Sequence, residues 1–221
     1  GNFVSVPTDC PQRDERLGWM GDAQIFIRTA GFNMNVAAFF TKWMDDVVDA
    51  QMPSGAFTDI VPQIRGMNEG APAWGDAGII VPWTLYRVYG DTAMIRKHYD
   101  AMQRWMRYIE AANPLLLRTK RLNNNYSDWV ALEKGSSAEQ IATAYWAKIA
   151  GMMAEMAAAI GREADAVHYA ALREEIRQTY IAAYVNPNGR VETNTQTAYV
   201  MALANDLLPE ELREAAADYL V

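Results

Sequence analysis

A short segment near the start of the chain concentrates side chains that could do chemistry on a polar ligand. Residues 9 to 24 read Asp-Cys-Pro-Gln-Arg-Asp-Glu-Arg-Leu-Gly-Trp-Met-Gly-Asp-Ala-Gln, without an apolar period. Carboxylates can donate or accept protons, arginines can hold hydroxyl groups, and an indole suits the apolar side of a sugar ring. The segment therefore predicts a loop that lines a polar pocket. The alternative is an irregular surface segment with a cluster of salt bridges.

This segment resembles the signature of the bacterial α-L-rhamnosidases of glycoside hydrolase family 78. The matching residues are Asp-Cys-Pro-Gln-Arg-Asp-Glu-Arg at 9–16 and Gly-Trp-Met-Gly-Asp at 18–22. Two later pieces fit as well, Ala-Trp-Gly-Asp-Ala at 73–77 and Tyr-Ser-Asp-Trp at 126–129. The resemblance extends over essentially the whole chain but covers only part of the family's catalytic domain.

The resemblance implies an inverting glycosidase that removes terminal α-L-rhamnose and places the proton donor at Glu15. Inverting enzymes use two carboxyl groups about 6.5–9.5 Å apart, one protonating the leaving oxygen and the other activating water. Neighbouring acids would raise the pKa of Glu15, whereas Arg13 and Arg16 would lower it. The alternative for Glu15 is a surface carboxylate paired with Arg16.

Further residues are expected to contact the sugar. Asp22 and Asp76 could do so from the pocket rim, although an Asp before a helix is also a favoured N-cap. Trp74 and Trp129 lie in long loops rather than on apolar stripes, so they are candidate sugar platforms. The full set of predicted substrate contacts is Asp9, Arg13, Trp19, Asp22, Trp74, Asp76, Asp128 and Trp129.

The sequence lacks the context of the family's catalytic base. The resemblance implies a Glu in a Trp-Glu pair, and no such pair occurs here. Glu133 and Glu192 are loop acids that could substitute, but neither has that context. We therefore expect this chain to hold the acid half of the site and to be inactive by itself.

Helical periodicity runs through almost the whole chain. Apolar residues recur at helical spacing, for example Ile95, Tyr99 and Met102, while long segments without such a period lie between them. No convincing pair of strands appears. The expected helices run from 22 to between 31 and 35, over 36–52 and 76–89, from a cap at Asp91 or Thr92 to 113, from a cap at Ser136 or Ser137 to 160, over 162–184 and 195–207, and from Pro209 as the first helical residue of the last one.

A faint internal repeat groups these helices into hairpins. Gly-Asp-Ala at 21–23 recurs at 75–77, and Thr-Ala-Tyr at 143–145 recurs at 197–199, both 54 residues later. Each interval holds two helices and one long loop, so the loops should fall on one side, where a pocket would form. The prediction is an all-α fold of about four helical hairpins. The resemblance implies part of an (α/α)6 barrel spanning residues 1–221, with the last third of the barrel and the accessory β-domains absent.

Composition limits which partners, membrane segments, disulfides and metal sites the chain could have. A net charge of -7 argues against a phosphate backbone as partner, and no apolar run approaches the roughly 20 residues of a membrane span. Cys10 is the single cysteine, which excludes an internal disulfide, and the two histidines lie far apart, so neither a metal nor a cofactor is expected. The first residues do not resemble a signal peptide, which leaves the compartment open.

Partners and alternative functions complete the expectations. The expected partner is a rhamnose-containing glycoside or polysaccharide, and an open barrel edge could favour self-association. The alternatives are another inverting (α/α)6 glycosidase and a helical scaffold that binds a partner without catalysis. Trp19, Trp74 and Trp129 facing one acidic cavity would favour the enzyme, and a smooth apolar groove would favour the scaffold.

Overall fold

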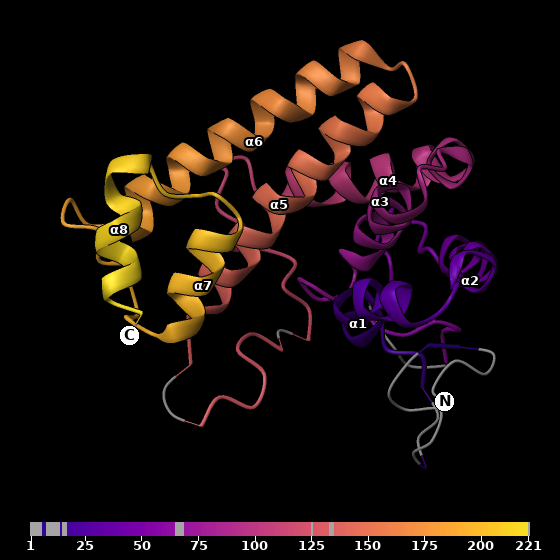
Figure 1. Cartoon of the computed structure of the whole chain (residues 1–221), viewed down its shortest axis with the longest axis horizontal. Coiled ribbons are helices and arrows are strands. Elements are labelled where there is room, and N and C mark those ends of the chain that lie inside the picture. Colours follow the sequence, from indigo (N-terminus) through magenta and orange to yellow (C-terminus); the bar gives the residue numbers. More distant parts are fainter. Residues whose placement is uncertain are drawn as a thin grey trace.

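All regular secondary structure in the described part of the chain is helical, with long loops between some of the helices (Figure 1). The computed structural model describes residues 6–7, 14, 17–64, 69–124, 126–132 and 135–220. Three isolated β-bridges join loop residues in this part, and no strand forms there. The helices are α1 (Met20–Asn33), α2 (Ala37–Asp49), α3 (Ala77–Tyr89), α4 (Ala93–Ala112), α5 (Ala138–Ala159), α6 (Glu163–Tyr184), α7 (Gln196–Ala204) and α8 (Glu210–Asp218). The predicted all-α fold is confirmed.

The helices pair into four consecutive hairpins whose odd-numbered members form a row. Helix α1 packs on α3, α3 on α5 and α5 on α7, while α2, α4, α6 and α8 pack beside their hairpin partners or neighbours. Figure 1 shows the long α5–α6 hairpin between the first two hairpins and the shorter α7–α8 pair. The long loops enter the odd-numbered helices, so their N-terminal ends share one side of the molecule.

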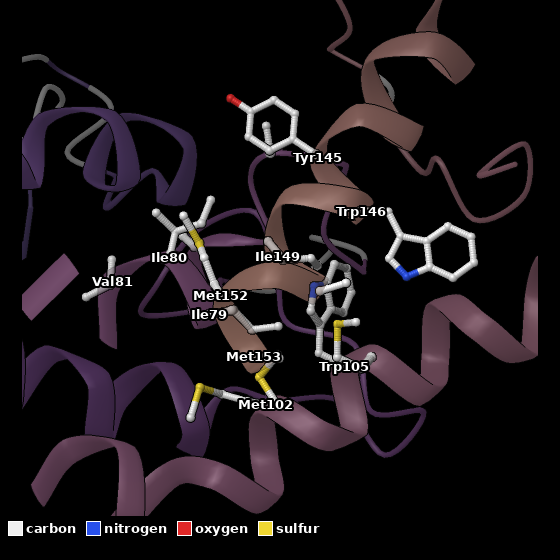
Figure 2. Packing of buried hydrophobic residues seen from close by; sticks show 14 of the residues in the cluster. Ile79, Ile80, Val81, Met102, Trp105, Tyr145, Trp146, Ile149, Met152 and Met153 are labelled. Carbon is white, nitrogen blue, oxygen red and sulfur yellow. The ribbon is translucent and has the colours of Figure 1, made fainter. Parts of the chain in front are cut away.

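The apolar stripes predicted from the sequence form the core. On α4, Ile95, Tyr99, Met102 and Trp105 are almost fully buried. Figure 2 shows side chains of α3, α4 and α5 meeting in one cluster. Helix α5 has buried residues on all sides, as expected for a helix that neighbours surround. Trp43, Trp105 and Trp146 are each 0% exposed, so these helical tryptophans belong to the core.

The starts of several helices differ from the sequence prediction. Helix α1 begins at Met20, so Asp22 lies inside its first turn and Trp19 occupies the N-cap position. Asp76 is the N-cap residue of α3, but its side chain makes no capping hydrogen bond to the helix. Pro209 is likewise the N-cap of α8 rather than its first helical residue. The cap prediction is confirmed at Ser137, whose hydroxyl oxygen accepts from the backbone N–H of Gln140 at 3.1 Å.

No helix in the described part of the chain is both long enough and apolar enough to cross a membrane.

Candidate functional site

An aromatic cluster centred on Tyr126 lies where the long loops meet. The ring of Tyr126 lies 4.2 Å from that of Trp74, with the two planes tilted by 35°. The rings of Trp19 and Trp129 meet Tyr126 edge-on, with centroids at 6.0 and 5.7 Å. Three tryptophans that the sequence predicted as sugar contacts are therefore gathered around one tyrosine. Trp129 is 68% exposed, so most of its indole remains accessible to a ligand.

A buried carboxylate, Asp59, anchors this cluster. The hydroxyl of Tyr126 donates to Asp59 Oδ2 at 3.1 Å, and the side-chain amide of Asn124 donates to the same oxygen. The backbone N–H of Ala71 donates to Asp59 Oδ1 at 2.7 Å, which ties the loop before α3 to the same residue. Burial raises the pKa of Asp59, although these three hydrogen bonds oppose the rise. Burial and the nearby Asp59 carboxylate raise the pKa of Tyr126 to about 12, so its phenol stays protonated and can donate.

A small pocket of about 190 Å³ adjoins this cluster at the N-terminal ends of the odd-numbered helices. It is smaller than the roughly 300–1,000 Å³ of sites for drug-sized ligands, so it fits one small molecule. Its wall is mostly apolar, with polar groups at a few points, including Gln24 Nε2, which donates to the Tyr145 hydroxyl at 3.3 Å. The lining residues come from the starts of α1, α5 and α7 and from the loop before α3, and include Gly21, Trp74, Ala138, Tyr145 and Thr197.

Close packing at Gly21 sets the position of Trp74. A Cβ atom added to Gly21 would lie 2.6 Å from Cε2 of Trp74, a separation that real Cβ atoms do not tolerate. Only glycine lets the indole lie flat against the first turn of α1. The two Gly-Asp-Ala repeats thus meet at the same end of the helical array, as the 54-residue offset predicted.

A second cavity of about 720 Å³ continues along the same row of helices. It shares Gln24 and Ile25 with the small pocket. Lys148, on α5, also lines it, and burial lowers the pKa of this lysine despite the opposing charge of Asp76. The row therefore presents a hollowed surface, not the smooth groove expected of a simple scaffold.

Asp76 lies below the pocket in a buried network. Arg118 donates to both of its carboxylate oxygens at 3.1 and 3.2 Å, and both residues are 0% exposed. The indole N–H of Trp105 and the backbone N–H of Ala73 also donate to the carboxylate, at 2.9 and 2.7 Å. Asp76 thus occupies the N-cap position of α3 without a side-chain capping bond, and it is fully buried rather than exposed at the pocket rim. Its carboxylate instead fixes the turn that carries Trp74.

Asp128 and Asp22 lie at the site but differ in their surroundings. Asp128 accepts from the backbone N–H of Ser136 at 3.1 Å and from the hydroxyl of Thr197 at 3.0 Å. It therefore joins the loop to the starts of α5 and α7, which is a structural role beside the predicted sugar contact. Asp22 is half-buried in the first turn of α1, close to Gly21 and thus to the pocket wall.

Three predicted site residues lie outside the described residues. They are Asp9, Arg13 and Glu15, so the proposed proton donor stays a prediction from the sequence. Of the two loop acids considered as a base, Glu133 also lies outside the described residues. Glu192 is exposed in the turn before α7 and does not line the small pocket. Among the described residues, no group of three or more potential metal ligands forms.

Comparison with known proteins decides the family. The model of the bacterial α-L-rhamnosidase six-hairpin glycosidase domain matches residues 1–221. The chain belongs to this family. An α-L-rhamnosidase of Streptomyces avermitilis is 45% identical over 221 residues, which are all of this chain and 21% of that protein. An α-L-rhamnosidase of Formosa agariphila is 36% identical, covering all of this chain and 24% of its own length.

A solved rhamnosidase structure has the same fold. The crystal structure of the Streptomyces avermitilis α-L-rhamnosidase complexed with L-rhamnose superposes with a TM-score of 0.94 at 44% identity, covering 100% of this chain and 21% of that one. This chain of the rhamnosidase family thus spans about a fifth of the length of these relatives.

Sequence reasoning missed two residues that organise this rhamnosidase-family site. Asp59 gave no motif signal, because its partners Ala71, Asn124 and Tyr126 are 12 to 67 residues away in sequence. Arg118 lies in a loop without helical period, and its pairing with Asp76 spans 42 residues. Tyr126 belongs to the quoted Tyr-Ser-Asp-Trp motif, which was the available signal for its role.

Proposed function

We propose that this chain contributes the acid side of the active site of an α-L-rhamnosidase. The reaction is hydrolysis of a terminal α-L-rhamnoside with inversion at the anomeric carbon. The substrate is a rhamnose-containing glycoside or polysaccharide. Family membership supports the reaction class, and the geometry of the described residues supports a sugar as the ligand.

The observation that carries this proposal is the aromatic cluster beside the small pocket. Trp19, Trp74 and Trp129 surround Tyr126, and Trp74 lines the pocket directly. Aromatic faces match the apolar patches of a pyranose, and rhamnose adds a C5 methyl group. The polar groups around the pocket wall are few and fixed, which is typical of sites that orient a small ligand.

In the proposed mechanism Glu15 protonates the glycosidic oxygen as the bond to the anomeric carbon breaks. A second carboxylate removes a proton from a water molecule that attacks the opposite face of the sugar. Asp9, Arg13 and Asp22 hold the sugar hydroxyls from the same loop and the first turn of α1. Trp74 and Trp129 cover the ring, while Asp76 and Asp128 hold the loops that carry these tryptophans.

We propose further that the four hairpins form part of a six-hairpin barrel. The described residues form four hairpins, whereas the matched family is described by six. The chain also spans only 21% and 24% of the two relatives. The base carboxylate then belongs to the remaining part of the barrel, facing the row of α1, α3, α5 and α7.

The test of this function compares two leaving groups in the full-length protein. Loss of a general acid slows a poor leaving group more than a good one, because a good one departs without a proton. We expect Glu15→Gln to lower kcat/KM about 10²–10⁴-fold for an alkyl α-L-rhamnoside and much less for a nitrophenyl α-L-rhamnoside. Proton NMR of the first sugar released should show the inverted anomer.

Glu211→Gln is the matched control, since Glu211 is an exposed glutamate on α8 that does not line the small pocket. It should leave both rates close to wild type. Equal losses for the two leaving groups in Glu15→Gln would contradict the assignment of Glu15 as acid. Binding of rhamnose without hydrolysis by the full-length protein would favour a binding scaffold instead.

A further inference from the structure

A hollow lined by three arginines lies apart from the aromatic pocket. Its volume is about 220 Å³, and Arg104, Arg107 and Arg121 line it together with Tyr108 and the turn at 53–55. Arg104 and Arg107 are three residues apart on α4 and therefore share one face of the helix. Arg121 reaches the hollow from the following loop. Such a concentration of positive charge is unexpected in a chain whose net charge is -7.

The guanidinium groups are only partly neutralised by protein groups. Arg104 donates to the neutral amide oxygen of Gln51, with Nε at 3.0 Å. Arg121 lies 3.6 Å from Glu69, a carboxylate that also accepts from the hydroxyl of Tyr108. Arg107 forms no ion pair within the described part of the chain. The charge of Arg107 also lowers the pKa of the half-buried Glu110, but burial raises that pKa by more. Glu110 does not line the hollow.

The dipole of α4 does not account for these arginines. Favourable interaction of a cation with a helix dipole is confined to the last turn. The last turn of α4, which ends at Ala112, contains no basic residue. Among the described residues, Arg121 has one acidic partner, Glu69, while Arg104 has only a neutral amide and Arg107 has no ion pair, so two of the three guanidinium charges are not neutralised.

The hollow is rigid enough to be a site. Gly55 has φ of +93°, and a Cβ added to it would lie 2.8 Å from the backbone oxygen of Arg104. The turn at 53–55 is thus held directly against α4. Arg121 lies over the ring of Tyr108 at 4.4 Å, while Trp105 stacks with the same ring at 5.3 Å. These contacts fix one wall and one of the three guanidinium groups.

We propose that this hollow binds an oxyanion, either a sulfate or a carboxylate, carried by an acidic saccharide. Guanidinium groups suit these anions because their N–H groups match pairs of anionic oxygens. A volume of about 220 Å³ holds one such group and part of the sugar that carries it. The hollow connects to the aromatic site through Tyr108, Trp105 and Asp76, and Asp76 fixes the turn of Trp74. This assignment is independent of the proposed hydrolysis.

The test measures binding by calorimetry with the full-length protein at low ionic strength. The probes are sodium glucuronate, glucose 6-sulfate, inorganic sulfate and neutral glucose. We expect the anionic probes to bind, glucose not to bind, and affinity to fall as salt is raised, since the guanidinium groups are exposed. The double variant Arg104→Gln/Arg107→Gln should lose at least tenfold in affinity.

Arg190→Gln is the matched control. Like Arg104, Arg190 is exposed and donates to one neutral side-chain oxygen, that of Asn194 at 3.2 Å, but it lies in the turn before α7. It should bind the anionic probes as wild type does. Arg107→Lys keeps the charge and tests geometry alone, so it should bind more weakly than wild type but more tightly than Arg107→Gln.

Two results would overturn the site: no binding of any anionic probe, or equal affinity in the double variant and the wild type. Tighter binding of glucose 6-sulfate than of inorganic sulfate supports the saccharide as ligand. Equal affinity for glucose 6-sulfate and inorganic sulfate overturns the saccharide as ligand and identifies a site for a free anion. If the double variant unfolds at a lower denaturant concentration, the two single variants decide whether the hollow is the binding site. Tighter binding of the anionic probes by Arg107→Lys than by Arg107→Gln supports the site, and equal binding overturns it.

Discussion

At the scale of single residues, the site depends on contacts that hold aromatic rings in place. Tyr126 touches three tryptophans and is itself held by Asp59. Trp74 is held by Gly21 on one side and by the buried Asp76 turn on the other. Small changes at these supporting residues should therefore affect the site without touching a substrate.

Gly21→Ala tests whether Trp74 must lie against α1. The added Cβ would meet the indole at 2.6 Å, so the ring has to move away from the pocket wall. Misplacing a contact by about 1 Å can cost about 10²-fold in rate, so we expect the full-length protein to lose about 10- to 100-fold in kcat/KM for an aryl α-L-rhamnoside.

Gly31→Ala is the control in the same helix. Its Cβ would meet Val88 at 3.5 Å, an ordinary van der Waals contact. Activity should stay at the wild-type level, and the free energy of unfolding should rise by about 0.5–1 kcal/mol because alanine is the better helix former. Equal activity in Gly21→Ala and Gly31→Ala would show that the position of Trp74 does not matter.

Asp59 should give a measurable pH dependence of stability. Burial raises its pKa above the ordinary 3.8 in the folded protein. The folded state then holds the proton to a higher pH than the unfolded chain, and unfolding releases a proton between 3.8 and the raised pKa. The contribution of Asp59 to the free energy of unfolding must therefore fall as pH rises across that window.

Urea unfolding of wild type and Asp59→Asn between pH 4 and 7 measures this contribution. Asparagine keeps the acceptor for the N–H of Ala71 but cannot ionise. We expect the stability of wild type relative to Asp59→Asn to decrease as pH rises. A constant difference across the range would mean that the pKa of Asp59 is the same in the folded and unfolded chains.

At the scale of elements, the N-terminal ends of the odd-numbered helices position the site. The loops that carry the site residues lead into these helix ends, which share one side of the molecule. Two of these starts are fixed by side-chain caps, Ser137 at α5 and Thr195 at α7. Asp128 joins the same two starts through Ser136 and Thr197. The site loops are thus fastened to helix ends rather than left to their own conformations.

Ser137→Ala tests the contribution of one cap. Its hydroxyl accepts from Gln140 N–H, and losing such a cap typically costs about 1 kcal/mol. Thr92→Ala is the control, since Thr92 is the N-cap of α4 but makes no side-chain capping bond. Chemical unfolding should show a loss of about 1 kcal/mol for Ser137→Ala and little change for Thr92→Ala. Equal losses would assign the effect to something other than the hydrogen bond.

At the scale of the whole molecule, burial is unequal along the row of hairpins. Fourteen of the 22 residues of α5 are buried, but only Ala216 of the nine residues of α8 is. Regions with few buried contacts open most readily. The row of α1, α3, α5 and α7 is therefore most firmly packed at α5, and its α7–α8 end is the less protected one.

Hydrogen exchange can measure this difference in the isolated chain. We expect backbone amides of α5 to exchange most slowly and those of α8 to exchange fastest among the helices. Mass spectrometry of peptides from the two helices gives the comparison directly. In a protein that carries all six hairpins of the proposed barrel, protection of α7 should increase if a further hairpin packs on it. Equal rates in α5 and α8 would contradict a core centred on α5.

The sequence by itself determined the class and the periodicity of the fold. Apolar spacing located every helix to within a few residues, because burial of one face is a local pattern. The spaced motif around Glu15 and Trp19 indicated the family. Sequence also named Trp19, Trp74 and Trp129 as substrate contacts, Trp74 and Trp129 because they lie in long loops and not on apolar stripes.

Tertiary structure alone decided what holds that site together. Asp76 reads as a helix cap in sequence, yet it is buried against Arg118 and Trp105. Asp59 and the arginine hollow depend on partners that are distant in the chain and share no local period. Burying a charged side chain costs free energy unless it is paired, and the partner can come from any part of the chain that the fold brings close. Such pairings become visible only when the helices are packed, which is why spacing alone could not predict them.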